Sequence, residues 1–460
     1  MKEYDVVVLG AGPGGYTAAL RTAKNGLKTA VIEKENLGGV CLNVGCIPSK
    51  SLLKNAEIAR TLRKDSKTFG ISCENLSLSY ASAVERSRKV SKRLNQGVAF
   101  LLKNAGVDVY FGRGEFSDAH TIHTVLNDGG EEDLRAENII IACGTKPVEI
   151  PGMMPDGEKI LNYRQAILQT NLPQRVVIIG GGAIGVEFAT VWNSYGAAVT
   201  IVEMQAHLLP NEDAEAGAEL ERAFKKQGIK IKTGTALCGV DKTEDGVTVH
   251  LKQNDTESTV DADQVVIVVG FRSNAPDLGL ENTGVTMSAR GWIETDEMCR
   301  TSVPNIYAIG DIAGKVLLAH TAEAMGKMVG DCIAGKEPAP LRYDLMPHAT
   351  YSHPQVASFG YTEESAKAAG IDYKTGKAGF IANGKALGLA ENEGWVKLLC
   401  SAENNAVIGA VLVGPEVSEL LPELSLAAAH GLTAEDIALN VHAHPTLSEV
   451  LMEAAEQAAG

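Results

Sequence analysis

Two segments of the chain share one pattern of hydrophobic and polar positions. Residues 6–9 and 176–179 are apolar, mostly β-branched runs, and each leads into a Gly-x-Gly-x-x-Gly turn and an alanine-rich stretch. A second apolar run then ends in an acid, Glu33 or Glu203, 23 positions after the first glycine of the turn. The pattern predicts strand, turn, helix and strand twice over.

Each glycine of such a turn has its own role in a dinucleotide-binding fold. The first permits the tight turn, the second lets the backbone approach a pyrophosphate, and the third lets helix and strand pack closely. The pyrophosphate lies at the helix N-terminus, and the acid accepts hydrogen bonds from the ribose. The glycines are Gly10, Gly12 and Gly15 in the first copy and Gly180, Gly182 and Gly185 in the second. We therefore expect two dinucleotides in two Rossmann-like domains, although two plain glycine-rich turns are the alternative.

The rest of the chain is divided by its apolar runs. Residues 51–145 look helical and then β-rich, and further buried strands are predicted at 264–270 and at 306–311, the latter ending in Gly-Asp. From about residue 344, strand-like runs alternate with Ala/Glu-rich helices and contain no nucleotide motif. This part predicts a third, α+β domain.

Composition narrows the function classes. The 460 residues allow roughly three domains. A formal net charge of −15 argues against nucleic-acid binding and against a polybasic membrane surface. No apolar run approaches the roughly 20 residues that span a bilayer, and no charged-then-apolar leader begins the chain. We expect a cytoplasmic protein without membrane insertion.

Two of the eight cysteines, Cys41 and Cys46, lie close together after Glu33. A metal pair is disfavoured because no second cysteine pair or nearby histidine accompanies them. A structural disulfide is disfavoured in a reducing compartment. A catalytic dithiol beside the first dinucleotide site is the favoured hypothesis, and two unreactive buried thiols are the alternative.

A second candidate lies near the C-terminus, where His444 precedes Pro445 and Glu449 follows five positions later. The pattern predicts a helix that starts at the proline and an imidazole base oriented by the acid. Taken alone, a solvated or capping histidine is the simpler interpretation.

These motifs together resemble the class I pyridine nucleotide–disulfide oxidoreductases. The resemblance rests on Cys-Leu-Asn-Val-Gly-Cys-Ile-Pro-Ser-Lys at 41–50, the two glycine turns, Gly310-Asp311 and His-Pro-Thr-Leu-Ser-Glu at 444–449, and it covers essentially the whole chain. It implies an α/β fold with two Rossmann-like dinucleotide-binding domains and a C-terminal α+β dimerisation domain. The implied boundaries are 1–146 and 271–343 for the FAD-binding and central parts, 147–270 for the NAD-binding domain and 344–460 for the dimerisation domain.

The resemblance also implies cofactors and residue roles. One FAD per subunit would be bound tightly without a covalent link, and NAD would be the co-substrate. The residues expected around FAD are Gly10, Gly12, Gly15, Glu33, Lys50, Gly114, Gly144, Asp311 and Ala319. The residues expected around NAD are Gly180, Gly182, Gly185, Glu203, Gly270 and Arg272. Lys50 would approach the flavin and pair with Glu187, although without the resemblance an ordinary surface pair would be the simpler reading.

Within the family, the chain most resembles enzymes that oxidise dihydrolipoyl groups on a separate carrier protein and reduce NAD to NADH. Cys41 would exchange with substrate, Cys46 would lie beside the flavin, and His444 with Glu449 would be the acid/base pair. The resemblance implies a homodimer with shared active sites, in which His444 serves the disulfide of the other subunit. A 2-oxo acid dehydrogenase or glycine cleavage complex would be served, and the sequence does not specify which.

Rival activities need other residues. Mercuric-reductase-like and large thioredoxin-reductase-like enzymes would carry a C-terminal cysteine pair, but the last cysteine is Cys400. A glutathione-reductase-like enzyme would need basic residues for NADP where Glu203 stands. A non-catalytic redox sensor or structural subunit would need neither the dithiol nor the His–Glu pair.

The chain departs from the family pattern at a few positions. Val40 and Cys143 replace usual threonines, and Phe271 replaces a usual arginine, so flavin packing and nicotinamide affinity are left open. Many relatives continue beyond the position of Gly460, which leaves the strength of the dimer open.

Overall fold

The computed structural model describes all 460 residues, which separate into two compact units. Unit 1 comprises residues 1–51, 84–148 and 270–343, and unit 2 comprises residues 52–83, 149–269 and 344–460.

Unit 1 is built on a parallel sheet extended by an antiparallel meander. Its strands are β1 (Lys2–Leu9), β2 (Thr29–Glu33), β3 (Asp108–Asp118), β4 (Thr121–Leu126), β5 (Glu131–Ile141) and β16 (Ile306–Ala308). Strands β3, β2, β1, β5 and β16 run parallel in that order. The far ends of β3 and β5 leave this sheet and pair antiparallel with β4. β1 is apolar along Val6–Leu9 because a parallel sheet is covered on both faces.

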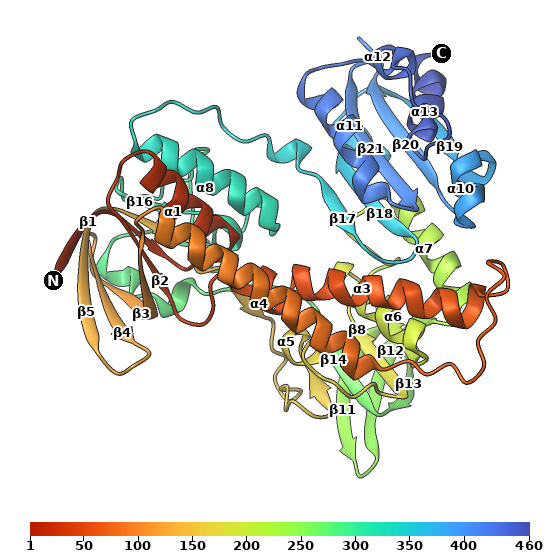
Figure 1. Cartoon of the computed structure of the whole chain (residues 1–460), viewed down its shortest axis with the longest axis horizontal. Helices are drawn as coiled ribbons and strands as arrows, with labels where there is room; N and C mark the ends of the chain where they lie inside the picture. Colours follow the sequence, from red (N-terminus) through yellow and green to blue (C-terminus); the bar gives the residue numbers. More distant parts are fainter. The chain divides into compact units, whose positions relative to one another are not determined.

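Helices cover this sheet. They are α1 (Pro13–Lys24), α2 (Gly39–Val44), the start of α3 (Cys46–Arg60), most of α4 (Tyr80–Asn104) and α8 (Ala319–Ile333). α1 and α8 lie side by side (Figure 1), and Gly326 makes their close approach possible. A Cβ at Gly326 would lie 2.5 Å from the carbonyl oxygen of Gly14. A short antiparallel pair, β6 (Thr145–Pro147) and β15 (Phe271–Ser273), completes the unit.

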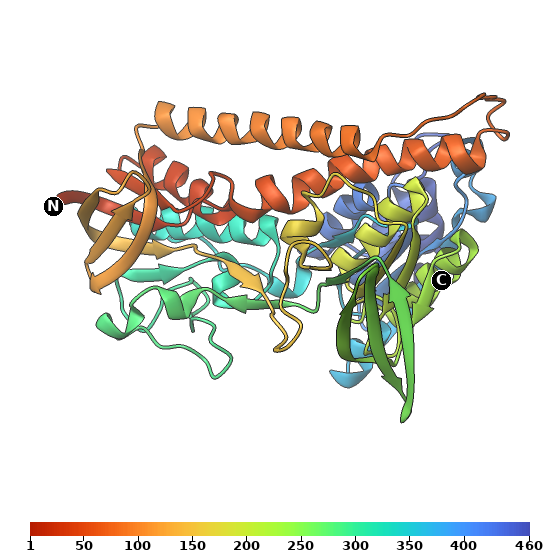
Figure 2. The ribbon, with the colours of Figure 1, turned by 90° about the horizontal axis from the view of Figure 1, so that it is seen from below.

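Unit 2 contains the second parallel sheet, in the order β10-β9-β8-β14-β7. The strands are β7 (Ile160–Leu161), β8 (Arg175–Ile179), β9 (Ala198–Val202), β10 (Lys230–Lys232) and β14 (Gln264–Ile267). The helices are α5 (Tyr163–Ala166), α6 (Ala183–Tyr195) and α7 (Ala214–Gln227). An antiparallel sheet of β11 (Ala236–Thr243), β12 (Gly246–Gln253) and β13 (Thr256–Ala262) is inserted before β14 (Figure 2).

The C-terminal part of unit 2 is an antiparallel sheet packed with helices. The strand order is β17-β18-β21-β20-β19, from β17 (His348–Thr350), β18 (Gln355–Gly360), β19 (Tyr373–Gly379), β20 (Trp395–Ser401) and β21 (Val407–Gly414). The helices are α9 (Glu363–Ala368), α10 (Gly384–Leu389), α11 (Val417–Ala429), α12 (Ala434–Leu439) and α13 (Glu449–Ala459). Leu424 of α11, Leu451 of α13 and Leu398 of β20 are almost fully buried in one core.

The predicted fold class is confirmed, with three corrections to element boundaries. The strand expected over 264–270 ends at Ile267, because its neighbour β8 has already ended at Ile179. The strand expected over 306–311 ends at Ala308 and is followed by a 3₁₀ turn. The helix expected to start at Pro445 begins at Glu449. The Thr446 hydroxyl donates to the carbonyl of Ala443, which competes with helix formation.

None of the helices has the length and apolar character needed to cross a membrane.

Candidate active site

In the first glycine turn, each of the three glycines has a different structural role, as expected for a turn that binds a pyrophosphate. Gly10 has φ +101°, and a Cβ there would lie 2.5 Å from the carbonyl oxygen of Ala142. A Cβ at Gly12 would meet nothing within 4 Å, so the backbone there is open to a ligand. A Cβ at Gly15 would lie 1.9 Å from the Gly10 oxygen, at the contact of helix and strand. No side chain caps the N-terminus of α1, so its N–H groups can bind a phosphate.

The acid of this turn is held in place by backbone donors. Glu33 is buried, and its Oε2 accepts from Ala11 N–H at 2.8 Å while its Oε1 accepts from Glu35 N–H at 2.7 Å. Burial raises the pKa of Glu33, and the two backbone donors act against that shift. The carboxylate therefore lies at the end of β2, beside the turn, as ribose recognition requires.

The second turn has the same geometry. Gly180 has φ +113° and a Cβ position 2.5 Å from Val268 O, and a Cβ at Gly185 would lie 2.0 Å from Gly180 O. Gly182 is open, and α6 also begins without a side-chain cap. Glu203 is buried, and its Oε2 accepts from Gly181 N–H at 2.6 Å. Both turns fit a dinucleotide.

Unit 1 adds polar groups that fit the flavin nucleotide. Asp311 follows β16, and burial raises the pKa of its carboxyl to about 6. The Thr145 hydroxyl donates to Asp311 Oδ2 at 3.4 Å, so Asp311 keeps acceptor capacity for the hydroxyls of a ligand. Gly144 has φ +60° and open space at its Cβ position. Cys143, the unusual residue before it, donates its thiol to Leu9 O at 3.2 Å and is satisfied within the fold.

The two cysteines meet across a break between helices. Cys41 lies in α2 and Cys46 is the first residue of α3, with Gly45 in a non-helical conformation between them. In one continuous helix, residues five positions apart would point about 140° away from each other. Instead the two groups are hydrogen-bonded, and both are thiols in this structure. That hydrogen bond, followed by burial, raises the pKa of Cys41, while Lys50 acts against the shift.

Sequence inspection did not identify the residues that hold this segment. Arg88 of α4 donates to the carbonyl of Asn43, and Asn95 donates to the carbonyl of Leu37 at 2.6 Å. Asn43 itself donates to the carbonyls of Leu37 and Gly39, each at 2.9 Å. The sequence indicated only that the helix carries polar residues. It could not indicate which residues they contact, because the partners lie 45 to 58 positions apart.

The structure distinguishes the two histidines near the C-terminus. The side chain of His442 is 3% exposed, and both of its ring nitrogens have partners, Asn440 O and Glu423 Oε1. The side chain of His444 is 78% exposed. Its Nδ1 lies 2.8 Å from Glu449 Oε1, and its Nε2 has no partner. His444 can therefore take a proton at Nε2 while the carboxylate orients the ring.

The remaining predicted residues lie in both units. Gly114 is inside β3, where a Cβ would lie 2.7 Å from the Leu9 side chain, so packing alone already requires glycine there. Ala319 begins α8, and Gly270 and Arg272 lie at β15, all in unit 1. Lys50 lies on α3 in unit 1, whereas Glu187 lies on α6 in unit 2. Glu187 Oε1 accepts from Tyr351 N–H at 3.1 Å.

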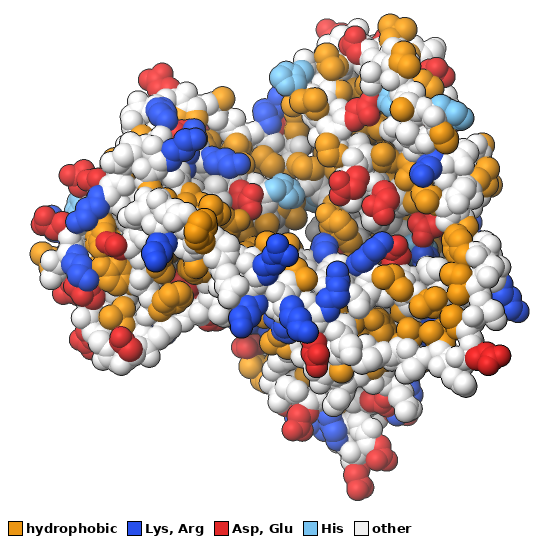
Figure 3. All heavy atoms as spheres, viewed as in Figure 1, with side chains coloured by type: hydrophobic (Ala, Val, Ile, Leu, Met, Phe, Trp, Pro, Cys, Tyr) orange, Lys and Arg blue, Asp and Glu red, His pale blue; other side chains and the backbone are white.

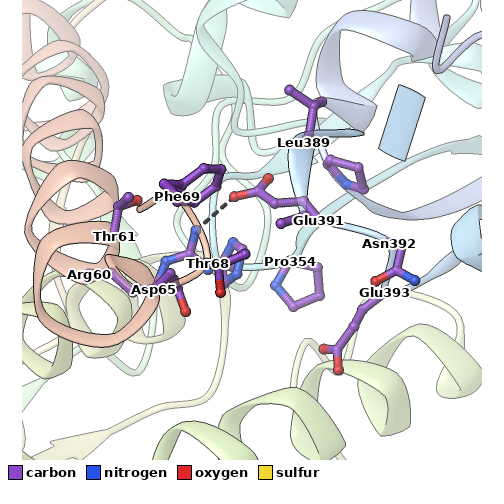
Figure 4. Close-up of a pocket in the computed structure, with 13 residues that line it drawn as sticks. Arg60, Thr61, Asp65, Thr68, Phe69, Pro354, Leu389, Glu391, Asn392 and Glu393 are labelled. Atoms are coloured by element: carbon purple, nitrogen blue, oxygen red, sulfur yellow. Dashed lines mark hydrogen bonds and ion pairs between the residues drawn. The ribbon is translucent and has the colours of Figure 1, made fainter. Parts of the chain in front are cut away.

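A separate cavity of about 290 Å³ lies within unit 2 (Figure 4). Arg60 donates to Glu391 at 2.7 Å in its wall, and burial lowers the pKa of His353 to about 3, so this imidazole is neutral near pH 7. The lining contains no cysteine, so the cavity is not the redox site. It is lined by Arg60, Thr61, Asp65, Thr68, Phe69, His353, Pro354, Leu389, Ala390, Glu391, Asn392, Glu393 and Pro415.

The fold agrees with comparisons to known proteins. The family model for pyridine nucleotide-disulphide oxidoreductases matches residues 4–326, and the model for the dimerisation domain of the same proteins matches residues 346–455. The chain belongs to the pyridine nucleotide-disulphide oxidoreductase family. It is thus a redox enzyme with FAD as prosthetic group and NAD as co-substrate, and it forms a homodimer.

Similar proteins indicate which enzymes of this family the chain most resembles. A dihydrolipoyl dehydrogenase of Mycobacterium leprae is 46% identical over 457 residues, covering 98% of this chain and 97% of the relative. A dihydrolipoyl dehydrogenase of Corynebacterium glutamicum is 46% identical and covers 100% of this chain and 98% of the relative. Among solved structures, LpdA of Mycobacterium tuberculosis superposes with a TM-score of 0.92 at 29% identity, covering 99% of both chains. The predicted family is confirmed.

Proposed function

We propose that the chain oxidises protein-bound dihydrolipoyl groups and passes the electrons to NAD, as the lipoyl-reoxidising subunit of a 2-oxo acid dehydrogenase or glycine cleavage complex. The observation that carries this proposal is the contact of Cys41 and Cys46 across the α2–α3 break, in a chain that is similar to dihydrolipoyl dehydrogenases over their full length. The six cysteines outside the Cys41–Cys46 pair are free, which suits a reducing compartment, so we place the reaction in the cytoplasm.

The proposed exchange begins with the oxidised pair, in which Cys41 and Cys46 form a disulfide. His444 takes a proton from one substrate thiol, because the thiolate is the nucleophile. The thiolate attacks Cys41 Sγ, and Cys46 leaves as a thiolate. The second substrate sulfur then attacks the mixed disulfide, which closes the lipoyl ring and leaves Cys41 reduced. Two electrons and two protons have then moved from the substrate dithiol to the enzyme.

The residues of unit 1 would hold FAD, and those of the second turn would hold NAD. We assign residues 1–146 and 271–343 to the FAD-binding and central parts, 147–270 to the NAD-binding domain and 344–460 to the dimerisation domain. Bound FAD supplies the two-electron chemistry that connects the dithiol to NAD. Glu33 and Asp311 would orient the nucleotide and ribityl hydroxyls.

We propose that His444 acts on the dithiol of the partner subunit. The domain that carries the exposed imidazole also exposes several large apolar side chains. Leu439 is 81% exposed, Val441 93% and Leu426 59%, all within the matched dimerisation domain. A second copy that docks on this domain would cover these apolar side chains. His444 would then face the partner subunit.

The test is NADH formation from free dihydrolipoamide by purified FAD-containing protein. Cys41→Ser and Cys46→Ser should each abolish turnover while keeping FAD and the dimer. The matched control is Cys238→Ser, an exposed thiol outside the site, which should keep full activity. Turnover that persists in both site variants would disprove the dithiol mechanism.

A further inference from the structure

The outward face of α4 carries a stripe of positive charge in a chain with a formal net charge of −15. Arg86, Lys89, Lys92 and Arg93, the basic stripe, are all exposed. Arg86, Lys89 and Lys92 follow one another at intervals of three, and Arg93 lies four positions after Lys89, which places the four on one face of the helix. Figure 3 shows Lys and Arg side chains gathered over the middle of α4. The only acid in the helix is Glu85.

The side-chain charges of Lys89, Lys92 and Arg93 are not offset within the chain. Lys89, Lys92 and Arg93 make no hydrogen bond or ion pair, whereas Arg86 donates to Ser51 O at 3.1 Å and to its hydroxyl at 2.9 Å. Some other bases of unit 1, Lys2 and Lys146 among them, are paired with carboxylates. Like charges three and four positions apart repel each other, so a negatively charged surface placed against them is attracted.

The stripe lies close to the redox pair. The opposite face of α4 holds the dithiol segment, through Arg88 on Asn43 and Asn95 on Leu37. Arg86 itself reaches Ser51, in the helix that begins with Cys46. One helix, roughly 10–12 Å across, therefore separates an object docked on the stripe from the segment that carries Cys41 and Cys46.

We propose that the basic stripe docks an acidic carrier domain and orients its dihydrolipoyl arm toward the dithiol. This inference rests on the proposed function and adds the surface that recognises the protein-bound substrate. An acidic domain is repelled by a surface of net negative charge and attracted at this stripe, so the stripe both steers the encounter and sets its orientation.

The experiment compares two triple variants of the FAD-containing dimer. The stripe variant is Lys89→Glu, Lys92→Glu and Arg93→Glu. The control is Lys24→Glu, Lys103→Glu and Arg290→Glu, three exposed bases of unit 1 that also lack ion pairs. Each variant reverses three charges, so both take the net charge from −15 to −21 (−15 − 6). The substrates are free dihydrolipoamide, which is neutral, and an isolated acidic domain carrying dihydrolipoyl-lysine.

With the carrier domain at low salt, the stripe variant should lose about tenfold or more in kcat/KM, and the control should stay close to the unmodified protein. The loss should shrink in about 0.5 M salt, because exposed charges are screened. Free dihydrolipoamide should be oxidised by both variants within about twofold of the unmodified rate, since it does not use the stripe.

Three results would overturn the proposal. The stripe and control variants could lose carrier activity equally, the stripe variant could lose both substrates equally, or it could elute as a monomer, which would make the stripe a contact between copies of this chain. Failure of the proposed function is distinct, because the unmodified protein would then oxidise neither substrate.

Discussion

His444 Nδ1 lies 2.8 Å from Glu449 Oε1, and the other oxygen of Glu449 accepts from the backbone N–H of Thr446 at 2.9 Å. These two contacts lower the pKa of Glu449, the backbone donor most strongly, so the carboxylate is ionised at neutral pH. The ring is thereby held with Nε2 directed outward and exposed.

Glu449→Gln should lower dihydrolipoamide turnover, because the amide cannot stabilise the imidazolium that forms. We expect a loss of about tenfold or more, below the roughly 10²–10⁴-fold loss of His444→Gln. The measurement is kcat/KM with free dihydrolipoamide. Glu453→Gln, an exposed acid one turn further along α13, should have no effect. An equal loss of activity in Glu449→Gln and Glu453→Gln would contradict the role of Glu449.

Mixed dimers test whether His444 acts on the other subunit. Cys41→Ser and His444→Gln should each be inactive alone. Co-expressed at equal levels, about half the dimers should be mixed, and in each one site combines an intact Cys41 with an intact His444. Activity should then recover to about a quarter of the unmodified level. Isolated mixed dimers that contain FAD and show no turnover would exclude the shared site.

Glu203 should determine the choice of nicotinamide cofactor. A 2′-phosphate about 4 Å from this carboxylate would be repelled by about 4 kcal/mol per unit charge at an effective dielectric constant of 20. The unmodified protein should therefore strongly prefer NAD to NADP, and Glu203→Ala should narrow the ratio of the two kcat/KM values. Glu244→Ala, an exposed acid of unit 2, is the control. Equal use of both cofactors by the unmodified protein would refute the prediction.

Asp311 should make the stability of the FAD-free protein depend on pH. Burial raises the pKa of Asp311 from 3.8 to about 6, so the folded state binds this proton more tightly than the unfolded chain does. The contribution favours folding at low pH, falls as pH rises from about 4 to about 6, and is lost above that. The full change is ~3 kcal/mol, at about 1.4 kcal/mol per pH unit.

Asp311→Asn should abolish this dependence and make the FAD-free protein more stable at pH 8, while weakening FAD binding. Urea unfolding between pH 4 and 8 measures the effect. Asp277→Asn, which removes an exposed ion pair with Lys146, should leave the pH dependence unchanged. Parallel stability curves for the Asp311 variant and the unmodified protein would refute the prediction.

The dinucleotide turns could be predicted from sequence because their geometry is local. Gly10, Gly15 and Glu33 are placed by a strand, a turn and a helix that follow one another directly, and the structure places them as expected. Arg88 could not be assigned, because its partner Asn43 lies 45 positions away and the contact depends on the packing of α4 against α2. The predicted start of α13 at Pro445 was wrong for another reason. Side-chain hydrogen bonds around Thr446 compete with helix formation there.

The basic stripe could be read from sequence only as a set of charges on a helix. Its proposed role in docking depends on which face of α4 points outward and on which segment lies against the other face. Both depend on tertiary packing, which the local sequence does not determine. The exposure of His444 beside the buried His442 is similar, because the sequence presents two histidines separated by one alanine.

The late position of strand β16 in the sequence delays completion of the sheet of unit 1 during synthesis on the ribosome. β16 pairs with β5, yet 165 positions separate Ile141 at the end of β5 from Ile306 at the start of β16. The nascent chain therefore exposes the open edge of β5 while the whole second dinucleotide fold is being synthesised, and exposed strand edges favour aggregation. Asp311 emerges later still. Completion of the flavin site thus belongs to the last third of translation, and a chain truncated before residue 306 would retain both glycine turns but lack the strand that closes the first sheet.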